Sequence, residues 1–165
     1  QALHPFDIPG TWALQRTIPM SYTRMSVDWA KAQTDGWKFT DTRFALNTGT
    51  RITVMMTGVT LETFQAALRA LLTRYRPWAI NPYNEPLPSA VLDYVPWVEA
   101  ARQVVDDMGL AGEVLLAGPS FCNSEMYNLY DELKTAGALD KLDVITAHDY
   151  FACPGNGQQG IMSGT

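Results

Sequence analysis

The tripeptide Asn84-Glu85-Pro86 is the segment of the chain with the clearest potential for chemistry. A carboxylic acid can protonate the leaving oxygen of an acetal while a second carboxylate attacks the sugar carbon, and an adjacent asparagine can hydrogen-bond the neighbouring sugar hydroxyl. The same residues also fit a helix start, where Asn84 caps, Glu85 faces the helix dipole and Pro86 takes the first turn. The tripeptide alone favours the helix cap, so the elements around it must decide between the two interpretations.

Apolar strands and amphipathic helices alternate along the chain from Met20 onward. Apolar and β-branched runs predict strands at 20–27, 51–56, 78–80, 113–117 and 142–147. Caps and apolar spacing predict helices at 40–46, 61–76, 89–108 and 124–135. The stretch between Trp29 and Arg51 is short for a full crossover helix. Because continuous apolar strands separated by helices are typical of parallel sheets, the sequence predicts an α/β fold.

Two architectures satisfy this alternation: an open doubly wound sheet and a closed (β/α)8 barrel. The chain contains neither a G-x-G-x-x-G turn nor a G-x-x-x-x-G-K-[ST] loop, which open sheets often carry after the first strand. Polar residues instead follow several predicted strands, at Asn84-Glu85, at Gly118-Pro119-Ser120 and at His148-Asp149-Tyr150. Barrels build active sites from the carboxyl ends of several strands, so this pattern favours the (β/α)8 barrel.

Four stretches, in this order, resemble the retaining glycoside hydrolases with (β/α)8 barrels, most nearly those of family 39 or family 5. Tyr22–Trp29 and Arg51–Gly58 are similar to the second and third strands of that barrel. Arg74–Trp78, followed by Tyr83–Pro86, is similar to the fourth strand, and Asp143–Tyr150 to the sixth. The resemblance covers roughly Met20 to Tyr150. It implies an O-glycosidase that cleaves a β-linked oligosaccharide or polysaccharide with retention and requires no metal or organic cofactor.

The resemblance gives Glu85 the role of general acid/base and gives Asn84 a role in substrate binding. Arg24 would support the nucleophile electrostatically. Without the resemblance, Arg24 fits equally well as a partner in an ion pair at the end of a strand.

Three further residues receive substrate-binding roles from the same comparison. His148 and Tyr150 would shape the sugar subsite, and Trp29 could stack on a sugar ring. Each has a simpler interpretation, because His148 alone fits a satisfied polar residue and aromatic side chains such as Tyr150 and Trp29 usually pack in the core.

The resemblance places the nucleophile, a second glutamate, at the end of a seventh strand that the 165 residues do not reach. A complete barrel needs at least about 200 residues. Glu113, Glu125 and Glu132 are in the wrong positions of the predicted elements to replace it. We therefore expect residues 1–165 to form a partial catalytic barrel domain, roughly the second to sixth βα units. The missing portion would come from another segment, another chain or another copy.

Composition limits the partners. The net charge is −5, from 12 basic and 17 acidic residues, so the basic footprint of a nucleic-acid-binding protein is absent. No apolar run approaches the roughly 20 residues of a membrane span. Cys122 and Cys153 follow neighbouring predicted strands, and either a disulfide between them or two free thiols fits. A disulfide would suit a secreted protein, which is the location we expect, and a cytoplasmic one is the alternative.

Two other functions compete with the glycosidase. The first is a catalytically inactive carbohydrate-binding or scaffold protein on the same fold, since a fold does not fix a function. The second is a different barrel or doubly wound enzyme in which Asn84-Glu85-Pro86 is only a helix cap.

Overall fold

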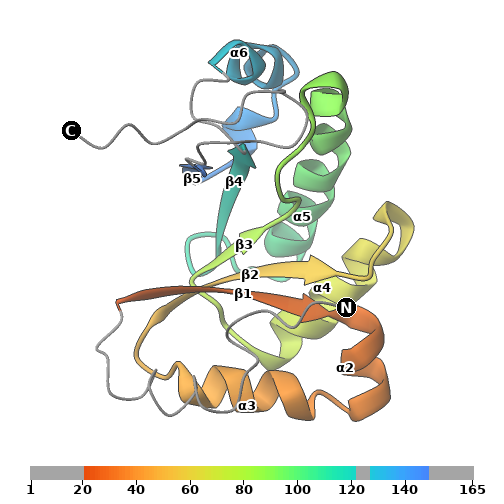
Figure 1. The fold of residues 1–165 in the computed structure, drawn as a ribbon, viewed down its shortest axis with the longest axis vertical. Helices are drawn as coiled ribbons and strands as arrows, with labels where there is room; N and C mark the ends of the chain where they lie inside the picture. Colours follow the sequence, from red (N-terminus) through yellow and green to blue (C-terminus); the bar gives the residue numbers. More distant parts are fainter. Residues whose placement is uncertain (1–20, 122–126, 149–165) are drawn as a thin grey trace, which may run out of the picture.

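The computed structural model describes residues 21–121 and 127–148 and has a mixed α/β fold (Figure 1). Its centre is a parallel sheet whose strand order follows the sequence, β1-β2-β3-β4-β5. The strands are β1 (Tyr22–Asp28), β2 (Arg51–Thr57), β3 (Ala79–Asn81), β4 (Leu115–Phe121) and β5 (Val144–Ala147). The sheet twists strongly, so that β1 and β4 run in clearly different directions in Figure 1. The predicted α/β class and parallel sheet are confirmed.

Helical segments connect each strand to the next. The α-helices are α2 (Trp29–Asp35), α3 (Lys38–Leu46), α4 (Leu61–Arg74), α5 (Val95–Asp107) and α6 (Tyr127–Thr135). Two 3₁₀ helices, η2 (Pro88–Tyr94) and η3 (Leu139–Lys141), complete the described elements. No helix within these residues combines the length and the apolar character needed to cross a membrane.

Helix α4 shows how the sequence sets a helix and its buried face. Thr60 and Thr63 form a reciprocal capping box, in which each side-chain oxygen accepts a hydrogen bond from the other residue's backbone N–H. The apolar spacing then buries one stripe of α4, consisting of Phe64, Ala67, Leu68, Leu71 and Leu72. This stripe packs on the sheet, and about 25 cal/mol per Å² of buried apolar area stabilises the contact.

Alternation along the strands separates an apolar face from a polar one. Met25, Val27, Ile52 and Val54 join the core that lies between the sheet and the helices. Successive side chains of a strand point to opposite faces, so the residues between these point away from the helices. On β1 and β2 that second face carries mainly polar or charged side chains: Tyr22, Arg24, Ser26, Asp28, Arg51, Thr53, Met55 and Thr57. The polar face is where a ligand could approach the sheet.

The first crossover differs from the single short helix predicted at 40–46. Two helices, α2 and α3, fill it, because Gly36 ends α2 in the left-handed conformation and Trp37 begins α3 with φ of 71°. Asp28 caps α2 by accepting a hydrogen bond from the Lys31 backbone N–H at 2.9 Å. The prediction therefore lacked the first helix of this crossover, α2, and began α3 two residues late.

Two other predicted boundaries were wrong. The helix predicted over 89–108 divides into the 3₁₀ helix η2 and α5, and Ala90 has non-helical dihedral angles inside η2. The strand predicted to stop before Gly118-Pro119 continues to Phe121, with a register shift against β5 between Pro119 and Phe121. This longer strand brings Ser120 into the sheet.

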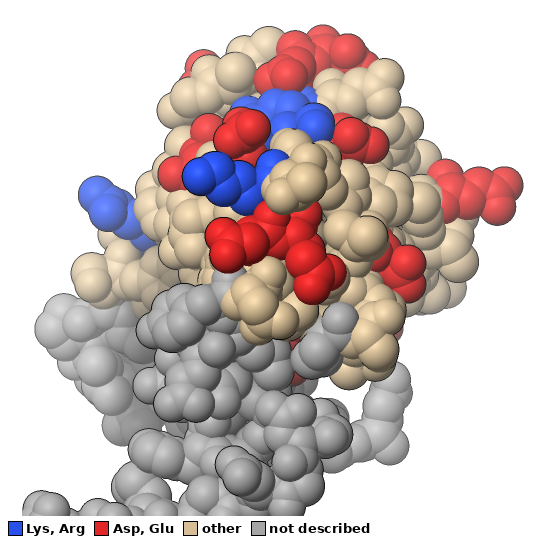
Figure 2. Space-filling view, turned by 90° about the horizontal axis from the view of Figure 1, so that it is seen from above, with Lys and Arg blue, Asp and Glu red and all other residues tan. Residues whose placement is uncertain are grey.

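Charged side chains of both signs are interspersed on the face shown in Figure 2. Several basic side chains of the described residues form ion pairs with acidic ones, including Arg102 with Asp143 at 2.7 Å and Lys141 with Glu99 at 3.2 Å. This face therefore lacks the broad basic surface with which proteins bind a phosphate backbone.

Candidate active site

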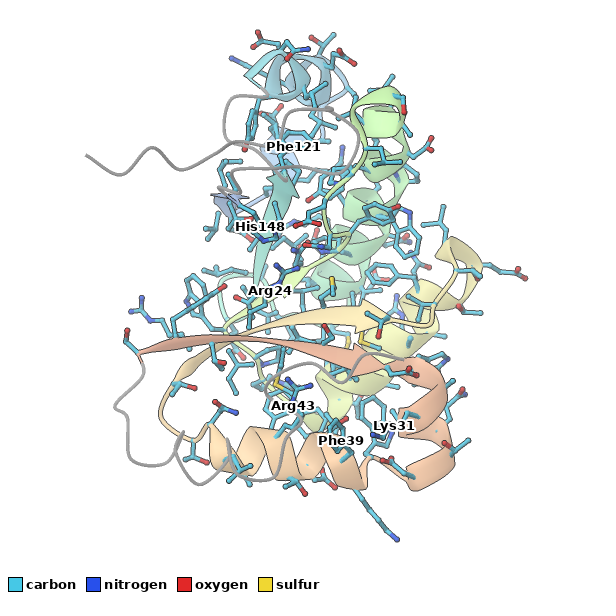
Figure 3. All side chains as sticks on the ribbon, viewed as in Figure 1. Arg24, Lys31, Phe39, Arg43, Phe121 and His148 are labelled. Carbon is cyan, nitrogen blue, oxygen red and sulfur yellow. The ribbon has the colours of Figure 1, made fainter. Side chains whose placement is uncertain are left out.

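Four of the residues singled out from the sequence come together at one edge of the sheet. Arg24 lies on β1, Asn84 and Glu85 follow β3, and His148 comes directly after β5. Figure 3 shows Arg24 and His148 near each other, with β1 and β2 on one side and β4 and β5 on the other. Asn84, Glu85 and His148 follow the carboxyl ends of their strands, which lie at the same end of a parallel sheet. Arg24 is the third residue of β1 and reaches them with its long side chain.

Hydrogen bonds join these four side chains into one group, which we call the Glu85 group. Arg24 Nη1 lies 2.6 Å from His148 Nε2, and Arg24 Nη2 donates to Asn84 Oδ1. His148 Nδ1 lies 2.5 Å from Glu85 Oε1. Arg24 Nη2 also lies 3.5 Å from Met55 Sδ. The guanidinium thus connects the asparagine to the histidine, and the histidine connects the guanidinium to the glutamate.

The direction of each hydrogen bond in the Glu85 group follows from the guanidinium. An arginine side chain has only donors, so His148 Nε2 must accept the bond from Arg24. The remaining ring nitrogen, Nδ1, then carries the hydrogen and donates a hydrogen bond to Glu85 Oε1. A neutral imidazole therefore stands between a cation and the carboxyl group, with its tautomer set by its two neighbours.

The Glu85 group is partly shielded and still open to a ligand. The side chain of His148 is 18% exposed and that of Glu85 is 31% exposed. Partial burial strengthens hydrogen bonds compared with those in bulk water, because the local dielectric constant is lower. The group combines a shielded, oriented carboxyl with access from outside.

The backbone at Glu85 adopts an uncommon conformation. Its φ is 51°, in the left-handed region that a side chain with a Cβ atom adopts at a cost of about 1–2 kcal/mol. The helix-cap interpretation of Asn84-Glu85-Pro86 is wrong, because the following helix η2 begins at Pro88 with Leu87 as its N-cap residue. Strained residues of this kind cluster at functional sites, where the surrounding structure holds them in place.

A cavity of about 400 Å³ lies on the polar face of the sheet, and two members of the Glu85 group, Arg24 and His148, line it. Its polar lining is Arg24, Thr53, Asn81, Ser120, Thr146 and His148. Hydrogen bonds between neutral side chains link β3, β4 and β5 along this lining. Asn81 Nδ2 donates to Ser120 Oγ at 2.9 Å, and Ser120 Oγ lies 2.7 Å from Thr146 Oγ1. The volume is within the range of small-molecule sites.

Thr53, Asn81 and Thr146 also line the cavity, although their sequence pattern did not predict them as site residues. Thr53 and Thr146 are polar residues inside runs that predict apolar strands, and Asn81 comes directly after the predicted strand 78–80. Ser120 was noted only as a polar residue at a strand end, and its φ of 54° places it in the left-handed region.

The remaining candidates lie elsewhere or outside the described residues. Trp29 packs edge-on against Trp37, with ring centroids 6.0 Å apart, and belongs to the apolar layer between the sheet and the helices. Tyr150, Cys122 and Cys153 lie outside the described residues, so their predicted roles stay predictions. Within residues 21–121 and 127–148, no three His, Cys, Asp or Glu side chains gather closely enough to hold a metal ion.

Comparisons of the chain with protein-family models, with curated proteins and with solved structures gave no match.

Proposed function

We propose that this chain belongs to a retaining glycoside hydrolase that cleaves β-linked glycans, with Glu85 as the general acid/base. The observation that supports this most is the hydrogen-bonded Glu85 group, in which the carboxyl of Glu85 contacts His148, a residue that lines the cavity. On this proposal, the five strands are the second to sixth strands of a (β/α)8 barrel, and the rest of the barrel comes from another segment, chain or copy.

The two oxygens of the Glu85 carboxyl have different tasks in this mechanism. Oε1 accepts the hydrogen bond from His148, so Oε2 is left to hold a proton and to donate it to the departing glycosidic oxygen. In the second step, the same oxygen takes a proton from the attacking water. His148 is thus a positioning residue, because it fixes which oxygen faces the substrate.

Asn84 gains its substrate-binding role from Arg24. The guanidinium donates to the Asn84 amide oxygen, which leaves the amide NH₂ to donate to a sugar hydroxyl. A donor held in this way stabilises a hydroxyl next to the reacting carbon without the cost of ordering the amide during the reaction.

The nucleophile is a second carboxylate, about 5–5.5 Å from that of Glu85 in a retaining enzyme. None of the residues that line the cavity in the described part of the chain is acidic. On this proposal the nucleophile is a carboxylate outside the described residues, as the resemblance to the barrel enzymes implies.

The test is the Glu85→Gln variant of the full-length protein, with Glu62→Gln on the surface of α4 as the matched control. Loss of the acid should lower turnover of glycans with poor leaving groups by about 10²–10⁴. Activated aryl glycosides should be partly spared, because their leaving groups need no proton. Unchanged turnover of glycans by Glu85→Gln would contradict the assignment. Glycan binding by the unmodified protein without any turnover would instead favour a non-enzymatic carbohydrate-binding protein.

A further inference from the structure

The floor of the cavity contains buried polar atoms that have no hydrogen-bond partner within the described residues. They are the Thr53 hydroxyl oxygen and the Asn81 amide oxygen. Thr53 is only 3% exposed and Asn81 only 2%, and both line the cavity. A buried polar group without a partner costs about 1–3 kcal/mol, so such groups are normally paired. Two such unpaired atoms on the floor of one cavity point to a molecule that binds there.

The position of the Asn81 amide is held by its neighbours. Its nitrogen donates to Ser120, and Ser120 in turn contacts Thr146 on β5. If the amide were turned over, its oxygen would face Ser120 and its nitrogen would be the unpaired end. In either orientation one end of the amide is left for a ligand.

The chemistry of the floor selects an uncharged ligand. Thr53, Asn81, Ser120 and Thr146 offer hydroxyl and amide groups, and no carboxylate or ammonium group lines the cavity in the described part of the chain. Among the described residues that line the cavity, Arg24 is the cation, and it already donates to Asn84 and His148. A hydroxyl group both donates and accepts, so it can pair with the Thr53 hydroxyl and with either end of the Asn81 amide.

We propose that Thr53 and Asn81 bind a hydroxyl group of the sugar ring on which Glu85 acts, and so determine which sugar enters the site. This inference rests on the proposed function and goes beyond it, because it assigns sugar selection to the middle of β2 and the end of β3. A site built to pair with a substrate hydroxyl rejects the analogue that lacks it, since its own buried groups are then left unpaired.

The experiment measures the binding of methyl glycosides to the full-length protein by calorimetry. Methyl β-glucoside, β-xyloside, β-mannoside and β-galactoside identify the best ligand, and its monodeoxy forms each remove one hydroxyl. Thr53→Val removes the hydroxyl at nearly constant volume, Thr53→Ser retains it, and Thr40→Val alters a buried threonine of α3 that does not line the cavity.

Thr53→Val should weaken binding of the best glycoside about five-fold, as expected for one neutral hydrogen bond. One monodeoxy form should bind Thr53→Val and the unmodified protein equally, which identifies the hydroxyl that Thr53 contacts. Thr53→Ser and Thr40→Val should bind like the unmodified protein.

Two outcomes would overturn the inference, and they differ in what they say about the proposed function. If Thr53→Val binds every glycoside normally while Asn84→Ala binds weakly, the floor holds only water and the proposed function stands. If the unmodified protein binds none of the glycosides, both the inference and the proposed function fail. Should Thr53→Val not fold, Thr53→Ala with a normal melting temperature replaces it in the same comparison.

Discussion

His148 Nδ1 lies 2.5 Å from Glu85 Oε1, although the two residues are 63 positions apart in the chain. Glu85 follows β3 and His148 follows β5, so their contact passes over the end of β4, which lies between them in the sheet. Strands two apart in a sheet are separated by about 9–10 Å, a gap that only side chains reaching toward each other can close. The contact therefore ties the geometry of the carboxyl group to the curvature of the sheet.

The first prediction concerns this contact. His148→Ala should lower kcat for glycans about 100-fold in the full-length protein, because the Glu85 carboxyl loses the donor that orients it. His148→Asn places an amide NH₂ near the position of Nδ1 and should recover part of the loss. Steady-state kinetics that separate kcat from KM check this, since loss of position should affect kcat more. Equal rates for the Ala and Asn variants would contradict a positioning role.

The second prediction concerns the left-handed backbone at Glu85. Glu85→Gly and Glu85→Ala both remove the carboxyl group, but only glycine adopts a φ of 51° without a steric cost. Glu85→Gly should therefore be more stable than Glu85→Ala by about 1 kcal/mol, measured by denaturant unfolding.

Asn84 provides the matched control for this comparison. It is not among the described residues with positive φ, so Asn84→Gly should be no more stable than Asn84→Ala. An equal stability of Glu85→Gly and Glu85→Ala would show that the backbone at Glu85 is unstrained.

The third prediction concerns the close approach of Gly118 to Tyr94. A Cβ atom on Gly118 would lie 2.0 Å from Tyr94 Oη and 3.1 Å from Cζ. The Tyr94 side chain is fully buried, and burial raises the pKa of its hydroxyl, which has no hydrogen-bond partner in the described part of the chain. Gly118→Ala should destabilise the protein by about 1–3 kcal/mol through overpacking.

Removal of the Tyr94 hydroxyl should relieve this clash. Tyr94→Phe with Gly118→Ala should regain much of the lost stability, while Tyr94→Phe alone should have a small effect because no hydrogen bond is lost. Additive effects of the two substitutions in thermal unfolding would refute the contact between them.

The elements with strong apolar patterns could be predicted from the sequence. The β-branched run of β2 and the apolar stripe of α4 need no tertiary information, because their own residues determine period and burial. Gly118-Pro119 misled the prediction of β4, since this pair usually ends a strand. Here the strand continues through this pair to Phe121, and its register against β5 shifts between Pro119 and Phe121.

The site was predictable only in part, for a similar reason. Glu85, Asn84 and His148 stand at strand ends, where a pattern of polar residues after apolar runs is visible in the sequence. Thr53 lies inside β2 and Asn81 is the last residue of β3, and whether they line a cavity depends on which face of the sheet the helices cover. A single threonine in an apolar strand gives no sign of that choice.

The last prediction concerns an exposed group on the helical layer, formed by Asp41, Arg74 and Tyr75. Arg74 donates to the Asp41 carboxylate at 2.9 and 3.1 Å and Tyr75 Oη donates at 2.6 Å; these bonds, first those from Arg74, lower the pKa of Asp41. Asp41 therefore binds a proton more readily in the unfolded chain than in the folded protein. The stability that its charge provides is present at neutral pH and is lost as the pH falls through the folded-state pKa of Asp41. Unfolding curves should show Asp41→Asn less stable than the unmodified protein at pH 7 and equally stable at about pH 2. A difference that stays constant over this range would mean that the charge of Asp41 contributes nothing.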